Sequence, residues 1–135
     1  MTESWIKRLL LLAAAWNILG GASALLDPAQ HFSQLYTSSL ALADPLQLFF
    51  YRCTWINVIA WGVAYALAAW HPGARKPALI AGAAGKFVYF LACASLFASG
   101  VGKPVLLAAG VVDVLLAVVF VATLASGRQA SRERP

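Results

Sequence analysis

Four long apolar runs, separated by short polar segments, dominate the pattern of the chain. Each run is long enough to cross a bilayer as a helix, because a span needs about 20 mostly apolar residues. The predicted spans cover residues 6–26, 45–70, 77–99 and 104–124. We therefore predict an all-α fold: an integral membrane four-helix bundle that forms one domain over residues 1–135, with a flexible polar tail at residues 126–135.

The segment between the first two spans is polar and mixed, but its apolar residues recur at helical spacing. They are Phe32, Leu35, Tyr36 and Leu40. This pattern predicts a short helix lying in the membrane interface. Asp-Pro pairs at 27–28 and 44–45 are each followed by a glutamine two residues later. Because Asp caps helices, Pro suits the first helical position and Gln can reach back to the cap, both pairs predict helix starts.

The composition agrees with a membrane protein. The chain is 61% hydrophobic and 11% charged, whereas soluble domains are about half apolar and a quarter charged. Its net charge is +5, but the basic residues lie in short clusters between the apolar runs. A nucleic-acid-binding face needs them gathered on one folded surface, so the distribution excludes a nucleic-acid partner.

Neither cysteine nor histidine forms a recognisable motif. Cys53 and Cys93 are far apart and lie in apolar runs, where free cysteine packs as a small hydrophobe. His31 and His71 have no second ligand at motif spacing. We therefore predict no metal site and no cofactor.

The basic residues also predict an orientation. They number two at the start of the first span, none in the next loop, two in the loop after it, one in the third and three in the tail. These residues are Lys7, Arg8, Arg75, Lys76, Lys103, Arg128, Arg132 and Arg134. By the positive-inside rule, both termini lie in the cytoplasm and the protein is a multi-pass protein of the cell inner membrane. The first run also resembles a signal peptide. Because it continues to Leu26, we expect a retained span.

Each span carries a polar residue at nearly the same depth. With a rise of about 1.5 Å per residue and a hydrocarbon core of about 30 Å, Lys86 lies roughly 13 Å from the inner surface. Asp113 lies about 16 Å from that surface, and Asn17 and Asn57 about 12 Å. An ionisable residue in a span marks a functional site by default. We predict that Lys86 and Asp113 pair inside the bundle, with Asn17 and Asn57 beside them.

Small and aromatic residues share the helix faces of these four polar residues. The first, third and fourth spans offer small neighbours that let backbones approach, and the second and third offer aromatic ones; they are Ala13, Gly21, Ala24, Gly82, Ala109, Ala117, Trp61, Tyr65 and Tyr89. Buried tryptophans either pack the core or line a pocket for a flat apolar ligand, and both interpretations stay open for Trp16, Trp55 and Trp61.

Arg52 has a different position. It lies about 10 Å below the outer surface, on a helix face about 140° from Asn57. It either snorkels outward or pairs with Asp27, or it helps to bind an anion or lipid headgroup. We include it among the candidate site residues.

One combination of residues resembles a known group. Over residues 45–124, the chain is similar to an uncharacterised family of small bacterial four-span membrane proteins, in the order Tyr65, Ala68-Ala69, Pro72, Gly82, Gly85-Lys86 and Asp113. The resemblance implies the four-span architecture and no activity. The architecture alone also looks like that of the DoxX-type proteins. Small multidrug transporters and the EXPERA proteins have four spans too, but this chain lacks the first-span glutamate of the former and the acidic and histidine residues of the latter.

Three classes of function follow from the intramembrane polar residues. Our leading hypothesis is a protein that binds a lipid-like or amphipathic small molecule at Lys86, Asp113, Asn17 and Asn57, with the aromatic residues against its apolar part. The alternatives are an accessory subunit of a larger membrane complex, and a small enzyme or transporter that uses Lys86 and Asp113 as a proton-transfer pair. A homo-oligomer fits each class. A purely structural ion pair that sets the helix register is the rival interpretation of the same residues.

Overall fold

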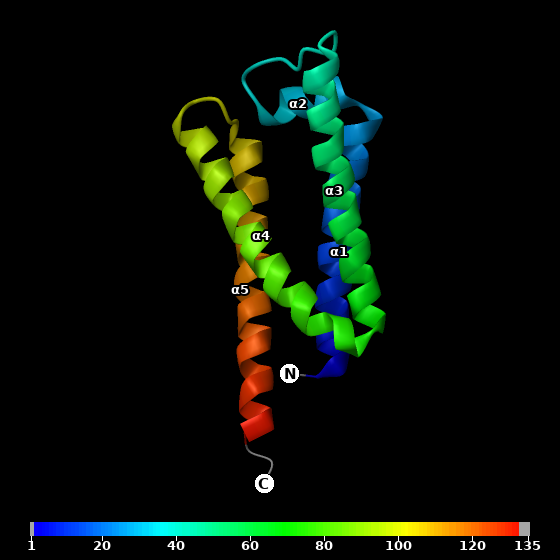
Figure 1. The fold of residues 1–135 in the computed structure, drawn as a ribbon. Helices are drawn as coiled ribbons and strands as arrows, with labels where there is room; N and C mark the ends of the chain where they lie inside the picture. The colour runs from blue at the N-terminus through cyan, green and yellow to red at the C-terminus, as the bar shows by residue number, and fades with distance from the viewer. Residues whose placement is uncertain (1, 133–135) are drawn as a thin grey trace.

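The computed structural model describes residues 2–132, and their side chains as far as residue 126. Five helices make up this part: α1 Glu3–Leu26, α2 Pro28–Leu35, α3 Pro45–Trp70, α4 Pro72–Ala98 and α5 Pro104–Arg132. Four of them are long and apolar enough to cross a membrane. The predicted all-α bundle, with a short helix between its first two spans, is therefore confirmed (Figure 1).

The long helices form two pairs. α1 packs along α3 and α4 packs along α5. The two pairs approach at the end of the bundle that holds the N-terminus and diverge toward the end that holds α2 (Figure 1). A site between the pairs is therefore built from residues that are distant in sequence.

Glycines let the helices of the first pair approach closely. A Cβ added at Gly21 would lie 2.5 Å from Ile59 Cγ1 and 3.0 Å from the carbonyl oxygen of Trp55. A Cβ added at Gly62 would lie 2.6 Å from Ile18 Cγ1. Small residues at such contacts permit close helix packing, as the sequence predicted for Gly21.

The two Asp-Pro pairs start helices as predicted. The Asp27 carboxylate accepts from the Gln30 backbone N–H at 3.0 Å, and the Asp44 carboxylate accepts from Leu46 and Gln47 at 2.9 and 3.2 Å. The expected return contact takes another form. The Gln47 side chain accepts a hydrogen bond from the Ala41 backbone N–H at 2.7 Å, so it braces the loop before the cap.

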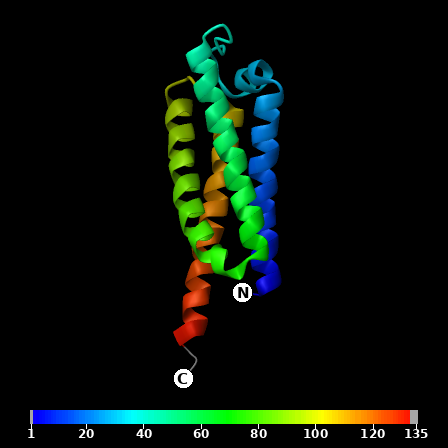
Figure 2. The ribbon, with the colours of Figure 1, turned by 45° about the vertical axis from the view of Figure 1, so that its right-hand side comes forward.

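Three helices extend beyond the predicted spans, and the first of them, α1, begins at Glu3 rather than at residue 6. α4 begins at Pro72 rather than at Pro77, because Pro72 suits the first helical position and His71 alone joins α3 to α4. Arg75 and Lys76 are thus helical, and the first turns of α4 lead away from α3 before the helix rises along α5 (Figures 1 and 2). At the other end, α5 continues to Arg132 through the expected tail; residues 133–135 lie outside the described part.

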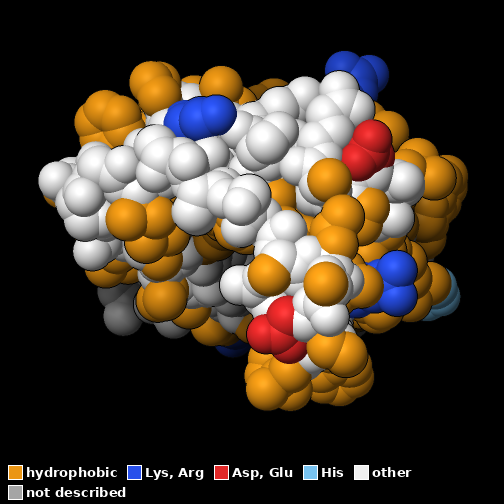
Figure 3. All heavy atoms as spheres, turned by 90° about the horizontal axis from the view of Figure 1, so that it is seen from above, with side chains coloured by type: hydrophobic (Ala, Val, Ile, Leu, Met, Phe, Trp, Pro, Cys, Tyr) orange, Lys and Arg blue, Asp and Glu red, His pale blue; other side chains and the backbone are white. Residues whose placement is uncertain are grey.

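The two ends of the bundle are packed differently. The end near the N-terminus holds the largest core cluster, in which Leu10 and Phe120 are completely buried. Large apolar side chains are exposed on the outside of all four long helices, among them Leu12, Ile56 and Leu115. Seen from the α2 end, hydrophobic side chains gather around the rim and the charged groups lie apart from one another (Figure 3). An apolar exterior of this kind suits contact with lipid.

Candidate functional site

A polar cluster lies inside the bundle, with one side chain from each of α1, α4 and α5. Lys86 Nζ donates to Asp113 Oδ1 in an ion pair and to Asn17 Oδ1 at 3.1 Å. Both charged residues are buried: Lys86 is 6% exposed and Asp113 is 7% exposed. Asn17 Nδ2 also donates to the Val58 carbonyl oxygen at 3.4 Å, which links the cluster to α3. The predicted Lys86–Asp113 pair and the predicted position of Asn17 are therefore present.

A cavity of about 690 Å³ lies between the two helix pairs and reaches this cluster. All five helices contribute to its wall, which is mostly apolar and includes both Lys86 and Asp113. Its volume falls in the range of small-molecule sites, about 300–1,000 Å³. The divergence of the two pairs thus leaves a hollow that begins where the packed core ends.

The aromatic candidates line the cavity. Tyr65 is 2% exposed, and Lys86 Nζ lies 5.9 Å from the centroid of its ring. Trp61 and Tyr89 are part of the same wall. Trp16 and Trp55 line it as well, so the three tryptophans that the sequence left open face the cavity.

Asn57 is placed in the same cavity but outside the polar cluster. Its side chain is exposed and lines the wall. Within residues 2–126, Lys86 Nζ donates to Asn17 and Asp113 and not to Asn57. The reason is the pairing of the helices: α3 packs along α1, and at this level the cavity separates α3 from α4.

Arg52 does not join the site. It is exposed and is absent from the cavity wall. In the described part of the chain it forms no ion pair. The Asp27 carboxylate, its predicted partner, instead caps α2. The inclusion of Arg52 among the site residues was therefore wrong for this cavity, since its direction on α3 points away from the other candidates.

Helix α2 closes the divergent end of the cavity, which the sequence did not predict. His31 Nδ1 lies 2.9 Å from the Tyr51 hydroxyl, and the His31 ring meets Trp55 edge-on with the centroids 4.6 Å apart. Phe32 and Tyr36 also line the cavity. Tyr51 and Trp55 are one helical turn apart, and this spacing was the available signal for a shared aromatic face.

Hydrogen bonds attach α2 to the α4–α5 turn. The Lys103 backbone N–H donates to the Leu35 carbonyl at 2.8 Å, and the Thr37 N–H donates to the Val101 carbonyl at 2.9 Å. Lys103 Nζ donates to the Ser33 carbonyl at 2.5 Å. These bonds connect the two helix pairs across the end of the cavity. Lys103, expected only as a loop charge, thus holds the cap of the cavity.

Burial shifts the pKa of two side chains in and beside α2, His31 and Tyr36. It lowers the pKa of His31, so this imidazole is neutral at pH 7. Burial, with a smaller contribution from the Cys93 thiol, raises the pKa of Tyr36. Both side chains are therefore uncharged where they face the cavity.

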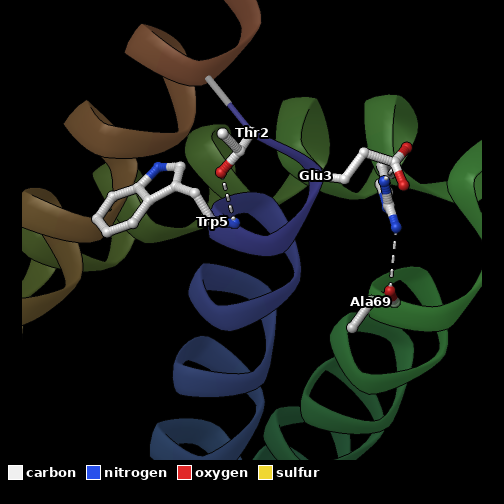
Figure 4. Close-up of polar contacts among 5 residues, drawn as sticks. Thr2, Glu3, Trp5 and Ala69 are labelled. Carbon is white, nitrogen blue, oxygen red and sulfur yellow. Dashed lines mark hydrogen bonds and ion pairs between the residues drawn. The ribbon is translucent and has the colours of Figure 1, made fainter.

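Charged side chains at the opposite end tie the helices together. The Arg75 guanidinium donates to the Glu3 carboxylate at 3.2 Å and to the Ala69 carbonyl at 3.3 Å, and Thr2 caps α1 by accepting from the Trp5 N–H (Figure 4). Lys7 Nζ lies 3.1 Å from the ring centroid of Trp70. These contacts join α1 to α3 and α4 outside the cavity, so we assign them to the fold.

The described residues contain no group of three or more His, Cys, Asp or Glu side chains that could hold a metal ion. Comparison of the chain with family models, curated proteins and solved structures finds no match. The resemblance to four-span families stays a prediction.

Proposed function

We propose that this is a multi-pass membrane protein that binds a lipid-like or amphipathic small molecule between its two helix pairs. The observation that carries the proposal is the cavity of about 690 Å³, because it is mostly apolar and has Lys86 and Asp113 in its wall. Ligand sites are typically apolar hollows with a few convergent polar groups. A bundle that used the ion pair only to set the helix register would need no hollow beside it.

The wall suggests how the ligand lies. Its polar end meets Lys86, Asp113 and Asn17, and its apolar part lies against the aromatic side chains between that level and α2. Tyr51 and Trp55 supply aromatic surface there, and their rings lie with centroids 6.2 Å apart. This arrangement favours a binding protein over the two alternatives. A bare accessory subunit does not need the cavity, and proton transfer needs a further acceptor beside the ion pair.

We further propose that the protein lies in the cell inner membrane with both termini in the cytoplasm. Lys7 and Arg8, in the first turns of α1, and Arg75 and Lys76, in the first turns of α4, lie at the end of the bundle that also holds the N-terminus. The opposite end, around α2, holds Arg52 and Lys103. The excess of basic residues at the N-terminal end supports this orientation.

Gly85→Phe tests the binding site. Gly85 lines the cavity beside Lys86, and a Cβ built there meets nothing within 4 Å. The new side chain therefore starts from open space in the cavity wall and takes up part of the hollow, and Phe is a better helix former than Gly. We expect the occupancy of added oleyl-chain amphiphiles to fall by about tenfold or more, as measured by native mass spectrometry of the delipidated protein.

Gly73→Phe is the matched control. Gly73 also belongs to α4 and also has open space around its Cβ position, but it does not line the cavity. We expect this variant to bind the probes like the parent protein. Equal binding by both variants, or no binding by the parent, would refute the proposed site.

A further inference from the structure

The charges in the cavity wall cancel one another. Lys86 and Asp113 are the charged side chains that line the cavity, and they form an ion pair with each other. His31, the remaining titratable base in the wall, is packed against Tyr51 and Trp55 of α3. The cavity therefore carries no net charge for a ligand to neutralise.

The polar cluster nevertheless has one N–H donor, on Lys86, that a ligand can use. An ammonium group has three N–H donors. Lys86 Nζ uses two of them, on Asn17 Oδ1 and Asp113 Oδ1. No side chain or carbonyl within residues 2–126 accepts the third donor, which leaves it for a group in the cavity, and the exposed carboxamide of Asn57 adds a donor and an acceptor in the same wall.

We propose that the ligand is an uncharged amphiphile whose hydroxyl or carbonyl head binds Lys86 and Asn57, an inference that rests on the proposed function. An anionic head would compete with Asp113 for the one ammonium and leave a buried negative charge without a partner. A cationic head would compete with Lys86 for the carboxylate in the same way. A neutral head takes the third N–H and leaves the ion pair intact.

Three probes that share one apolar chain test this inference: oleyl alcohol, oleyl sulfate and oleylamine. The full-length delipidated protein is mixed with equal concentrations of all three at pH 7.5, and the bound species are counted by native mass spectrometry. We expect oleyl alcohol to be bound at least about tenfold more than either charged probe, because each charged head leaves one buried charge unpaired.

Single neutral substitutions should reverse this preference. Asp113→Asn leaves Lys86 without its carboxylate, so oleyl sulfate should gain at least about tenfold relative to oleyl alcohol. Lys86→Gln leaves Asp113 alone, so oleylamine should gain instead. The double variant Lys86→Gln/Asp113→Asn keeps the shape and polarity of the pair without charge. It should retain the preference for oleyl alcohol, and it keeps the test decisive if the single variants do not fold.

The outcomes separate the inference from the function on which it rests. A parent protein that binds a charged probe best, or folded single variants that leave the order of the probes unchanged, would overturn the neutral-ligand inference while the binding site stands. Binding that is unaffected by Gly85→Phe would instead show that the cavity is not the site, and with it the inference would fail.

Discussion

At the scale of single residues, the main feature is the buried ion pair between Lys86 and Asp113. Lys86 and Asp113 come from helices α4 and α5, and each satisfies the other inside an apolar wall. The sequence indicated this pair, because two opposite charges at one depth in adjacent spans leave each other as the natural partner. Arg52 shows that depth in the membrane does not by itself place a residue in the cavity. Its depth placed it in the membrane, but its direction around α3 placed it outside the cavity.

Removing one member of the pair should cost more than removing both. Lys86→Met or Asp113→Leu alone leaves an unpaired buried charge, which costs about 3–5 kcal/mol of stability. The double variant leaves none, so we expect its loss to be smaller than either single loss. Thermal melts of the parent and the three variants in detergent measure the three losses. Losses that simply add in the double variant would contradict the pairing.

At the scale of elements, α4 combines tight packing and open space within one turn. Gly82 faces Tyr65 and Phe120, and a Cβ built there would lie 2.8 Å from Tyr65 Cε1 and 2.9 Å from Phe120 Cε2. Gly85 faces the cavity, and the same construction meets nothing within 4 Å. The two glycines therefore serve different purposes. The first lets α4 approach α3 and α5, and the second leaves the wall beside Lys86 open.

Alanine at these two positions should have opposite effects. Gly82→Ala should destabilise the protein by about 1–3 kcal/mol, because the buried Tyr65 and Phe120 rings have little room to move. Gly85→Ala should be neutral or should stabilise it by up to about 1 kcal/mol, because alanine favours the helix and nothing opposes the added methyl group. Thermal melts of the two variants provide the measurement. Equal losses at both positions would refute the assigned packing.

Helix α2 shows what periodicity alone reveals about an element. The spacing of Phe32, Leu35, Tyr36 and Leu40 predicted a short helix between the first two spans. The helix is present but ends at Leu35, and Leu40 lies in the loop that follows. Only the structure shows that α2 covers the divergent end of the cavity. The bonds from the α4–α5 turn to Leu35 and Ser33 join segments about seventy positions apart, and no local pattern announces such contacts.

At the scale of the whole molecule, the proposed orientation predicts where each loop lies. Helix α1 begins and helix α5 ends at the end of the bundle opposite to α2 (Figure 1). A green fluorescent protein fused after residue 135 should therefore fluoresce in cells, because it folds in the cytoplasm. Alkaline phosphatase inserted in the loop at residues 37–43 should be active, because that loop would lie outside.

The exchanged fusions serve as controls for this orientation. Alkaline phosphatase after residue 135 should be inactive, and the fluorescent protein in the loop should be dark. The reverse set of signals would place the termini outside and would contradict the orientation inferred from the basic residues.

The sequence by itself determined the class of fold, the approximate spans and three residues of the polar cluster, Asn17, Lys86 and Asp113, although it also placed Asn57 there. These follow from local physics: an apolar run must be helical in lipid, and an intramembrane charge needs a partner. The sequence did not determine where α4 begins, because Pro72 and Pro77 are both acceptable near a helix start.

Only the tertiary structure decided that the bundle is hollow beside Lys86. Whether four helices pack solidly or diverge depends on how the pairs cross, and that is settled by contacts such as Gly82 with Tyr65, between residues distant in sequence. The same residues would make a structural strut in a closed bundle. With the cavity beside them, they are the polar end of the proposed binding site.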